Sequence, residues 1–136
     1  MTTAPAVYGI WNQTTGDRIY TTSSAEVSTD TASGYTSLGV VFHGVTTTGS
    51  GYAPVFRLRS PQGKHLYTPY TGERDLLVAN GWTLEGTPFS VSLKSRPGTV
   101  PEYRFYDMVK HAHYLSSSAT VPSGSRSDNL IIWPAP

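Results

Sequence analysis

The sequence predicts an all-β domain made of three copies of one module. Three observations lead there: a repeat, alternating apolar and polar segments, and regularly placed turns. Tyr20, Tyr67 and Tyr114 are each 47 residues apart. The same step relates Gly16 with Gly63, Thr21 with Thr68, Glu26 with Glu73, Gly34 with Gly81 and Phe42 with Phe89. A fixed period of this size indicates one supersecondary unit used several times. We expect a single domain over residues 1–136, with repeats at approximately 6–45, 54–93 and 102–136.

The second repeat displays the expected elements most clearly. Residues 55–59 alternate and predict a strand, residues 60–63 a turn, and residues 65–68 the returning strand. Residues 73–80 predict a short helix that stops at Gly81. Residues 82–85 and 89–93 then predict two more strands, with a turn between them at Gly86.

The other two repeats follow this plan to different extents. The first predicts strands at residues 7–11 and 18–21, and Ser23 with Glu26 has the spacing of a helix capping box. The third begins alike at residues 102–106 and 113–115, but Pro122, Gly124 and a serine-rich run replace its helix. Residues 129–133 predict its last strand. We thus expect about four strands per repeat, and a short helical turn in repeats one and two.

Three such repeats favour a closed body, because closure removes the exposed strand edges that separate sheets would carry. The predicted fold is therefore a β-trefoil with pseudo-threefold symmetry. A β-prism of three copies is the alternative.

Composition excludes several classes of function. The 136 residues include no cysteine, so disulfides and cysteine metal sites are excluded. Only 14% of residues are charged and the formal net charge is +1, which argues against nucleic acid as a partner. The first residues form no leader peptide, and no apolar run is long enough to span a membrane. We expect a cytoplasmic protein with a polar, nearly neutral surface, which suits hydrogen bonding to neutral ligands such as sugars.

One family resemblance rests on the second repeat. Its residues 56–58, 63–68, 73–75, 81–82, 85–86 and 89 read FRL, GKHLYT, ERD, GW, EG and F. This pattern resembles a tandem repeat of bacterial and fungal proteins with the consensus YRLYNPxTGDHFYT…ER…GW…EG…F. The resemblance covers repeats one and two and the first half of repeat three. It implies a module that is often attached to secreted hydrolases and is associated with glycan binding.

The chain is also similar in kind to β-trefoil lectins. The strand–turn–strand portion resembles the opening of ricin-type repeats, but the Gln-x-Trp signature is missing. The sugar-binding residues of that family are therefore not carried over. Size and the absence of cysteine and leader further resemble cytosolic fungal β-trefoil lectins. The lectin-like light subunit of mushroom tyrosinase belongs to the same broad shape class.

Arg57 and Glu85 form a candidate couple on the first and third strands of repeat two. The equivalent positions of repeat one are Gly9 and Leu38, so both charges are lost together. A structural ion pair would explain this, because an unpaired buried charge is costly. A ligand-binding arginine–glutamate couple is the alternative, and the sequence leaves both open.

No pattern predicts catalysis. His65 lacks a visible acid or nucleophile, His43 stands alone, and no Gly-x-Ser-x-Gly motif occurs. His111 and His113 place two imidazoles on one predicted strand face, which suits a metal, but a third ligand is missing. We expect a protein that is not an enzyme and holds no cofactor or metal. An enzyme with a metal at these two histidines is the minor alternative.

Aromatic residues near the turns give the functional prediction. Trp11 and Asn12 lie near Asp17, and Tyr106 and Asp107 lie near His111 at equivalent places. The middle repeat has Arg59 and Ser60 near Lys64 instead. Aromatic rings cover the flat C–H faces of sugars, and neighbouring polar groups bind the hydroxyls. Trp82 and Trp133 are expected in the core instead.

We therefore expect a lectin-like protein that binds a neutral saccharide or glycoconjugate in shallow surface pockets. The alternative is a protein partner, as for protease inhibitors or accessory subunits of enzymes. The linkers at residues 45–53 and 94–101 would then supply the contact loop.

Overall fold

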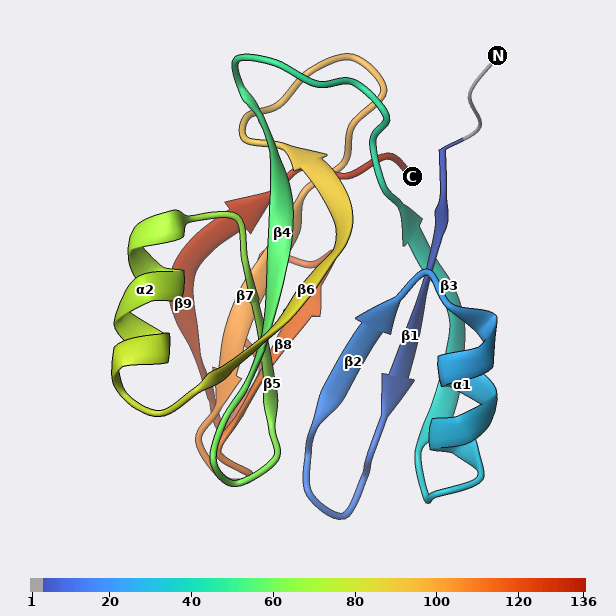
Figure 1. Cartoon of the computed structure of the whole chain (residues 1–136), viewed down its shortest axis with the longest axis vertical. Coiled ribbons are helices and arrows are strands. Elements are labelled where there is room, and N and C mark those ends of the chain that lie inside the picture. Colours follow the sequence, from blue (N-terminus) through green and yellow to red (C-terminus); the bar gives the residue numbers. More distant parts are fainter. Residues whose placement is uncertain (1–3) are drawn as a thin grey trace.

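Three similar units, each a small antiparallel sheet, make up the computed structural model, which describes residues 4–136 (Figure 1). Unit one contains β1 (Ala6–Trp11), β2 (Arg18–Thr21), the helix α1 (Ser24–Thr31) and β3 (Thr36–His43). Its strands are ordered β2-β1-β3, so that the first strand lies in the middle. The sheet therefore begins as a hairpin, and the third strand pairs on the other side.

Units two and three repeat this order. Unit two contains β4 (Tyr52–Arg59), β5 (His65–Thr68), the helix α2 (Thr71–Ala79) and β6 (Thr83–Ser92), ordered β5-β4-β6. Unit three contains β7 (Glu102–Asp107), β8 (Ala112–Ser116) and β9 (Ser125–Ile132), ordered β8-β7-β9. Between β8 and β9 the described chain forms turns and bends and no helix, as the sequence predicts.

The prediction of four strands per repeat is wrong, because each unit has three. The residues expected to form two strands around Gly86 form the single long strand β6. Gly86 has φ 114°, and the register of β4 and β6 shifts beside it. Gly39 and Asn129 occupy the equivalent place, with φ 75° and 55°. A residue with positive φ here makes a β-bulge, which bends the strand without reversing the chain.

Strand register also corrects the tyrosine repeat. Tyr20 pairs with Gly9, Tyr67 with Arg57, and Leu115 with Arg104. Leu115, one residue beyond the evenly spaced Tyr114, is therefore the structural equivalent of Tyr20 and Tyr67. The hairpin turn of unit two is one residue shorter than the other two, so a constant step of 47 does not hold through the third unit.

Side chains, rather than strand pairing, join the three units. Within residues 4–136 the three sheets are separate, and two isolated bridges, His43–Ala135 and Ser92–Trp133, link the C-terminal residues to units one and two. The body is therefore mostly β with three sheets, and the closed β-trefoil barrel stays a prediction. One buried core cluster draws on all three units: Val7, Tyr20, Phe42, Val55, Tyr67, Phe89, Val91, Leu115, Leu130 and Ile132.

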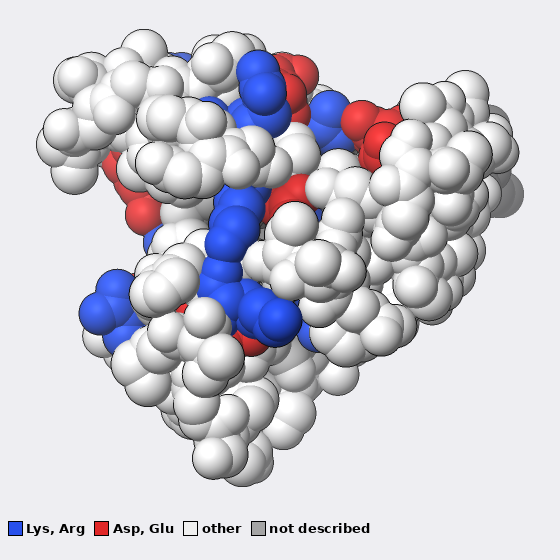
Figure 2. Space-filling model, turned by 90° about the horizontal axis from the view of Figure 1, so that it is seen from below, with Lys and Arg blue, Asp and Glu red and all other residues white. Residues whose placement is uncertain are grey.

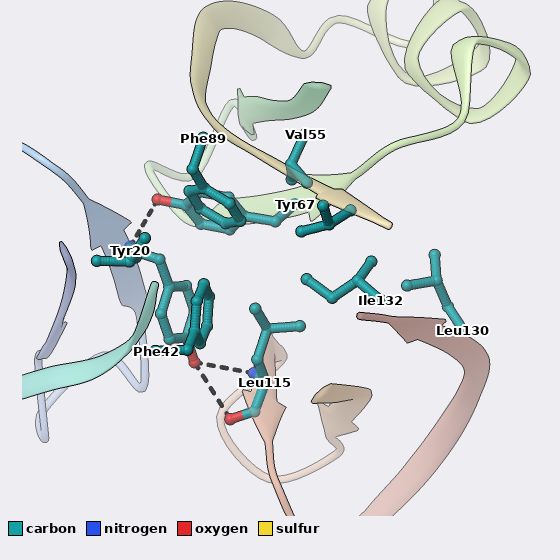
Figure 3. Close-up of a cluster of buried hydrophobic side chains, with 10 residues drawn as sticks. Tyr20, Phe42, Val55, Tyr67, Phe89, Leu115, Leu130 and Ile132 are labelled. Carbon is teal, nitrogen blue, oxygen red and sulfur yellow. Dashed lines mark hydrogen bonds between the residues drawn. The ribbon is translucent and has the colours of Figure 1, made fainter. Parts of the chain in front are cut away.

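Two tyrosine hydroxyls tie this core together (Figure 3). Tyr67 accepts a hydrogen bond from the backbone N–H of Tyr20 at 2.7 Å. The Tyr20 hydroxyl in turn accepts from the N–H of Leu115 at 2.8 Å and donates to the Leu115 carbonyl. Each tyrosine thus satisfies the backbone of a neighbouring unit inside the core, Tyr67 that of unit one and Tyr20 that of unit three, where an unpaired group would be costly.

The two ends of the molecule differ. The hairpin turns after β1, β4 and β7 gather at one end, at the bottom of Figure 1, and we call this the hairpin end. The long connections between units and the C-terminus lie at the opposite end. Neither helix, α1 or α2, has the length and apolar character needed to cross a membrane.

Candidate functional site

Two ion pairs join neighbouring units. Glu26 of α1 binds Arg57 of β4 through both carboxylate oxygens, at 2.7 and 2.8 Å. Glu73 of α2 binds Arg104 of β7 in the same two-pronged way, at 2.9 and 2.7 Å. In each case the helix of one unit holds the first strand of the next. We call these pairs the helix clamps.

A second carboxylate meets each clamp arginine within its own unit. Arg57 Nε lies 3.1 Å from Glu85, an ion-pair distance without hydrogen-bond alignment. Arg104 Nε donates to Asp128 at 2.9 Å. The predicted Arg57–Glu85 contact is therefore present, and Gly9 and Leu38 stand in for it in unit one. Its stronger partner, Glu26, lies in another unit and was missed.

A histidine also lies beside each helix clamp, in contact with the second carboxylate of its arginine. His65 lies with one ring nitrogen 2.7 Å from Asp17 and the other 3.0 Å from Glu85. His113 lies 2.6 Å from Asp128. Hydrogen bonding from Arg57 lowers the pKa of the Glu26 carboxyl. Burial alone would raise the pKa of Asp128, but His113 and Arg104 hold it below its ordinary value. The clamps therefore stay ionised at neutral pH.

The three turns meet at the hairpin end through lysine side chains. Lys64 donates to the carbonyl of Lys110, and Lys110 donates to the carbonyl of Thr14 at 3.3 Å. Viewed onto this end, Lys and Arg side chains run across the middle of the face between uncharged lobes (Figure 2). The turns are thus fixed relative to one another, and hollows form between them rather than within any one unit.

The larger hollow lies between units two and three and has a volume of about 460 Å³. We call it hollow 2/3. Unit two contributes one set of lining residues and unit three the other: Ser60, Gln62, Lys64, His65, Trp82, and Tyr106, His111, Ala112, His113. Two aromatic side chains and several hydrogen-bonding groups therefore face the same space. That composition and size are ordinary for a small-molecule site.

The smaller hollow lies between units one and three and has a volume of about 310 Å³. Trp11, Arg18, Asp107, Lys110 and Tyr114 are among its lining residues. The Arg18 guanidinium lies over both rings, 4.8 Å from the centre of Trp11 and 4.9 Å from that of Tyr114. Because the cation covers both aromatic faces, this hollow, which we call hollow 1/3, leaves them less free to stack on a ligand.

The Tyr106 side chain is held in place from several sides. Its hydroxyl lies 3.0 Å from Nδ1 of His111, and its ring centre lies 4.7 Å from that of His113. The Arg126 guanidinium lies 4.7 Å from the ring centre. His111 has φ 57°, in the left-handed region that Gly16 and Gly63 occupy in the other two turns. His111 therefore adopts a strained backbone conformation at a position that places its imidazole in the lining of hollow 2/3.

The six predicted site residues separate into three groups. Tyr106 and His111 come together in hollow 2/3, whereas Trp11 and Asp107 line hollow 1/3. Asn12 and Asp107 are turn formers, each accepting two backbone N–H hydrogen bonds through Oδ1. Asp17 is 1% exposed and is bonded to His65 and the Tyr35 hydroxyl, so it faces neither hollow.

The predicted pair of histidines on one strand face is not formed. β8 begins at Ala112, so His111 belongs to the turn, and Nδ1 of His113 faces Asp128. Among residues 4–136, no group of three or more histidine, aspartate or glutamate side chains is placed to hold a metal ion.

Several lining residues were missed because the sequence groups residues by repeat, whereas the hollows form between repeats. Trp82 was expected in the core. It packs against the small cluster of Phe56, Leu58 and Leu66, and it also lines hollow 2/3. Gln62 and Lys64 lie in the turn of unit two, where Arg59 stands in place of the aromatic residue of the other units, Trp11 or Tyr106. The predicted threefold arrangement of hairpins could have indicated these residues, since such an arrangement brings the turns of neighbouring repeats together.

Comparison with known proteins gives one family. Residues 3–121 match the family described as domain of unknown function (DUF5648). No curated protein and no solved structure matches the chain.

Proposed function

The chain belongs to the DUF5648 family of domains of unknown function, and from the site itself we propose that it is a lectin-like protein that binds a neutral saccharide in hollow 2/3. In this proposal the protein binds its ligand and catalyses no reaction. The proposal includes a β-trefoil-like arrangement of the three units, in which the hairpin end is the ligand face. A ligand here would touch two units at once, as expected when the recognition surface lies between repeats.

The observation that carries the proposal is that Trp82 of unit two and Tyr106 of unit three line the same hollow together with polar side chains. An aromatic ring offers a sugar the flat, polarisable surface that its C–H face requires. Ser60, Gln62 and His111 supply donors and acceptors for hydroxyl groups. The Lys64 ammonium is already bonded to the Lys110 carbonyl, which favours a neutral over an acidic sugar.

A glycan array followed by calorimetry tests the proposal. We expect Tyr106→Ala to weaken binding of the best glycan by roughly tenfold or more, because the stacking surface is lost. Tyr70→Ala is the matched control, since Tyr70 is 46% exposed and outside both hollows. Silence on the array and at millimolar monosaccharide, or equal losses in both variants, would contradict the proposal.

A protein partner is the second candidate, favoured by the tip of the third turn. Met108 and Val109 are 47% and 74% exposed, and they lie in the turn between the two hollows. Apolar side chains at an exposed turn suit insertion into a protein surface. Inhibition of a protease panel that Val109→Asp abolishes would support this candidate, and unaltered inhibition by that variant would oppose it.

A further inference from the structure

The third junction, between units three and one, lacks its helix clamp. The arginine of the other two clamps, Arg57 or Arg104, is replaced there by Gly9. Unit three has no helix to supply the glutamate, and Leu38 takes the place of Glu85. A side chain at Gly9 would be crowded, because an added Cβ would lie 3.0 Å from the Val41 side chain and 3.4 Å from that of Leu38.

A hollow of about 260 Å³, separate from hollow 1/3, lies at this junction, and we call it the third-junction hollow. Leu38 and Val41, the neighbours of Gly9, form one wall, and Leu115 with Ser116 and Ser117 forms another. The first wall is apolar, and the second adds two serines to Leu115. Leu38 and Val41 are also partly exposed, at 40% and 36%, so the hollow opens to solvent on their side.

Glu102 contributes the acidic side chain of this hollow. It pairs with Ile132, as Val7 pairs with Phe42 and Val55 with Phe89, so it occupies a core position that is valine in the other units. Glu102 is only 6% exposed, and its side chain has no hydrogen-bond or ion-pair partner among residues 4–136. Burial raises its pKa to about 7. A glutamate at a valine position is costly unless something pairs with it.

We propose that the third-junction hollow binds a small organic cation, a guanidinium or ammonium group on a short apolar stem, with Glu102 as its counter-charge. The ligand would restore from outside the carboxylate–cation pair that Glu26–Arg57 and Glu73–Arg104 form at the other junctions. Its stem would replace solvent along Leu38 and Val41. Charge-assisted hydrogen bonds in such a buried place are the strong ones.

The other polar groups at the hollow leave Glu102 available. Arg18 of β2 also lines it, but its guanidinium lies over the rings of Trp11 and Tyr114. Tyr20 of β2 is engaged with the Leu115 backbone. The strand β3 contributes only apolar side chains to this hollow, and β8 and the residue after it contribute Leu115 and two serines. Of the lining residues, Glu102 alone carries a carboxylate.

Titration with methylguanidinium at millimolar concentration, followed by amide NMR, tests the inference. At pH 8 we expect saturable shifts at Leu115, Ser116 and Ser117, with at least tenfold weaker binding in Glu102→Gln. Binding should also weaken by about tenfold for each pH unit below 7, because the carboxyl must lose its proton.

Glu102→Gln removes a buried charge without changing shape, so it should fold at least as well as the parent protein. Asp75→Asn, which removes one charge from an exposed site, is the matched control and should bind normally. Non-saturating shifts, or equal affinity in Glu102→Gln, would overturn the inference. No saccharide is involved, so the outcome is independent of hollow 2/3.

Discussion

At the scale of single residues, the turn of unit three carries a side chain where the others carry none. His111 takes φ 57° at the place of Gly16 and Gly63, which have φ 82° and 84°. Glycine adopts this conformation without steric cost, whereas other residues are strained there. The imidazole gained in return lies beside the Tyr106 hydroxyl in hollow 2/3.

We therefore predict that His111→Gly affects stability and saccharide binding in opposite ways. We expect the free energy of unfolding to stay the same or rise by about 1 kcal/mol, because the strain is relieved. Saccharide affinity should fall, since the group that positions Tyr106 is removed. Urea denaturation and calorimetry measure the two effects. A variant that is clearly destabilised, or that binds as well as the parent, would refute this assignment.

Glu102 makes a second prediction at this scale. Its ordinary pKa of 4.5 is raised to about 7 by burial. The folded protein therefore holds a proton that the unfolded chain releases, and this stabilisation is present below pH 4.5 and lost as pH rises through 7. In the absence of a cation, we expect Glu102→Gln to be more stable than the parent at pH 8, by on the order of 3 kcal/mol.

The two proteins should differ little at pH 5, where the glutamate is protonated. Denaturant titrations at pH 5 and pH 8 measure the difference. A constant gap between Glu102→Gln and its parent at both pH values would show that ionisation of this carboxyl is not the cause.

At the scale of elements, the helices act through one carboxylate each. α1 and α2 contain no buried residues, and in the described part of the chain their one apolar contact with a core cluster is that of Leu77 of α2, partly buried against Phe56, Leu58 and Leu66. Ser23 caps α1 as the sequence predicts, accepting from the N–H of Glu26. The Glu26 side chain does not return to the cap but crosses to Arg57 of the next unit. Each helix thus serves mainly to hold the neighbouring sheet.

A double-mutant cycle on Glu73 and Arg104 measures this role. Arg104 is 5% exposed, so Glu73→Gln should cost about 3 kcal/mol by leaving a buried charge with one partner fewer. Glu73→Gln combined with Arg104→Met should cost clearly less than the two single changes added together. Additive losses in denaturant titrations would show that the pair does not act as a unit.

The clamps also predict sensitivity to acid. The carboxyls of Glu26, Glu73 and Asp128 have pKa values below their ordinary ones of 4.5, 4.5 and 3.8. Their stabilisation is therefore complete above the ordinary values and is lost as pH falls through the lower, folded-state values. Below about pH 4, the free energy of unfolding should fall less steeply with decreasing pH in Glu73→Gln than in the parent protein. An unchanged acid profile would argue against the clamps as its cause.

At the scale of the whole molecule, tyrosine hydroxyls and one shared core replace strand pairing between units (Figure 3). Tyr20→Phe would leave the buried N–H of Leu115 without its acceptor, at a cost of about 1–3 kcal/mol. Tyr114→Phe loses only a half-buried contact with Ser125 and should cost less. Thermal unfolding compares them. Equal losses would show that the Tyr20 hydroxyl matters no more to the core than the Tyr114 hydroxyl does.

Sequence alone predicted the parts of this body that depend on local pattern. Hairpins, the helices of units one and two, and the linked loss of charge at Gly9 and Leu38 can all be read from residue type and spacing. The single third strand was missed because Gly86 suits a bulge as well as a turn. Contacts between units were missed because the spacing of a sequence repeat carries no information on which residues of different repeats come together. The Glu26–Arg57 ion pair is a contact of that kind, and hollow 2/3, which Trp82 and Tyr106 both line, is a site of that kind.

A crystal soaked with a mixture of simple sugars tests saccharide binding most directly. We predict a sugar ring in hollow 2/3, with one face on Trp82 or Tyr106 and its hydroxyls bonded to Gln62 or His111. A sugar bound elsewhere, or no sugar bound at concentrations that saturate known lectins, would contradict the assignment of this hollow as the ligand site.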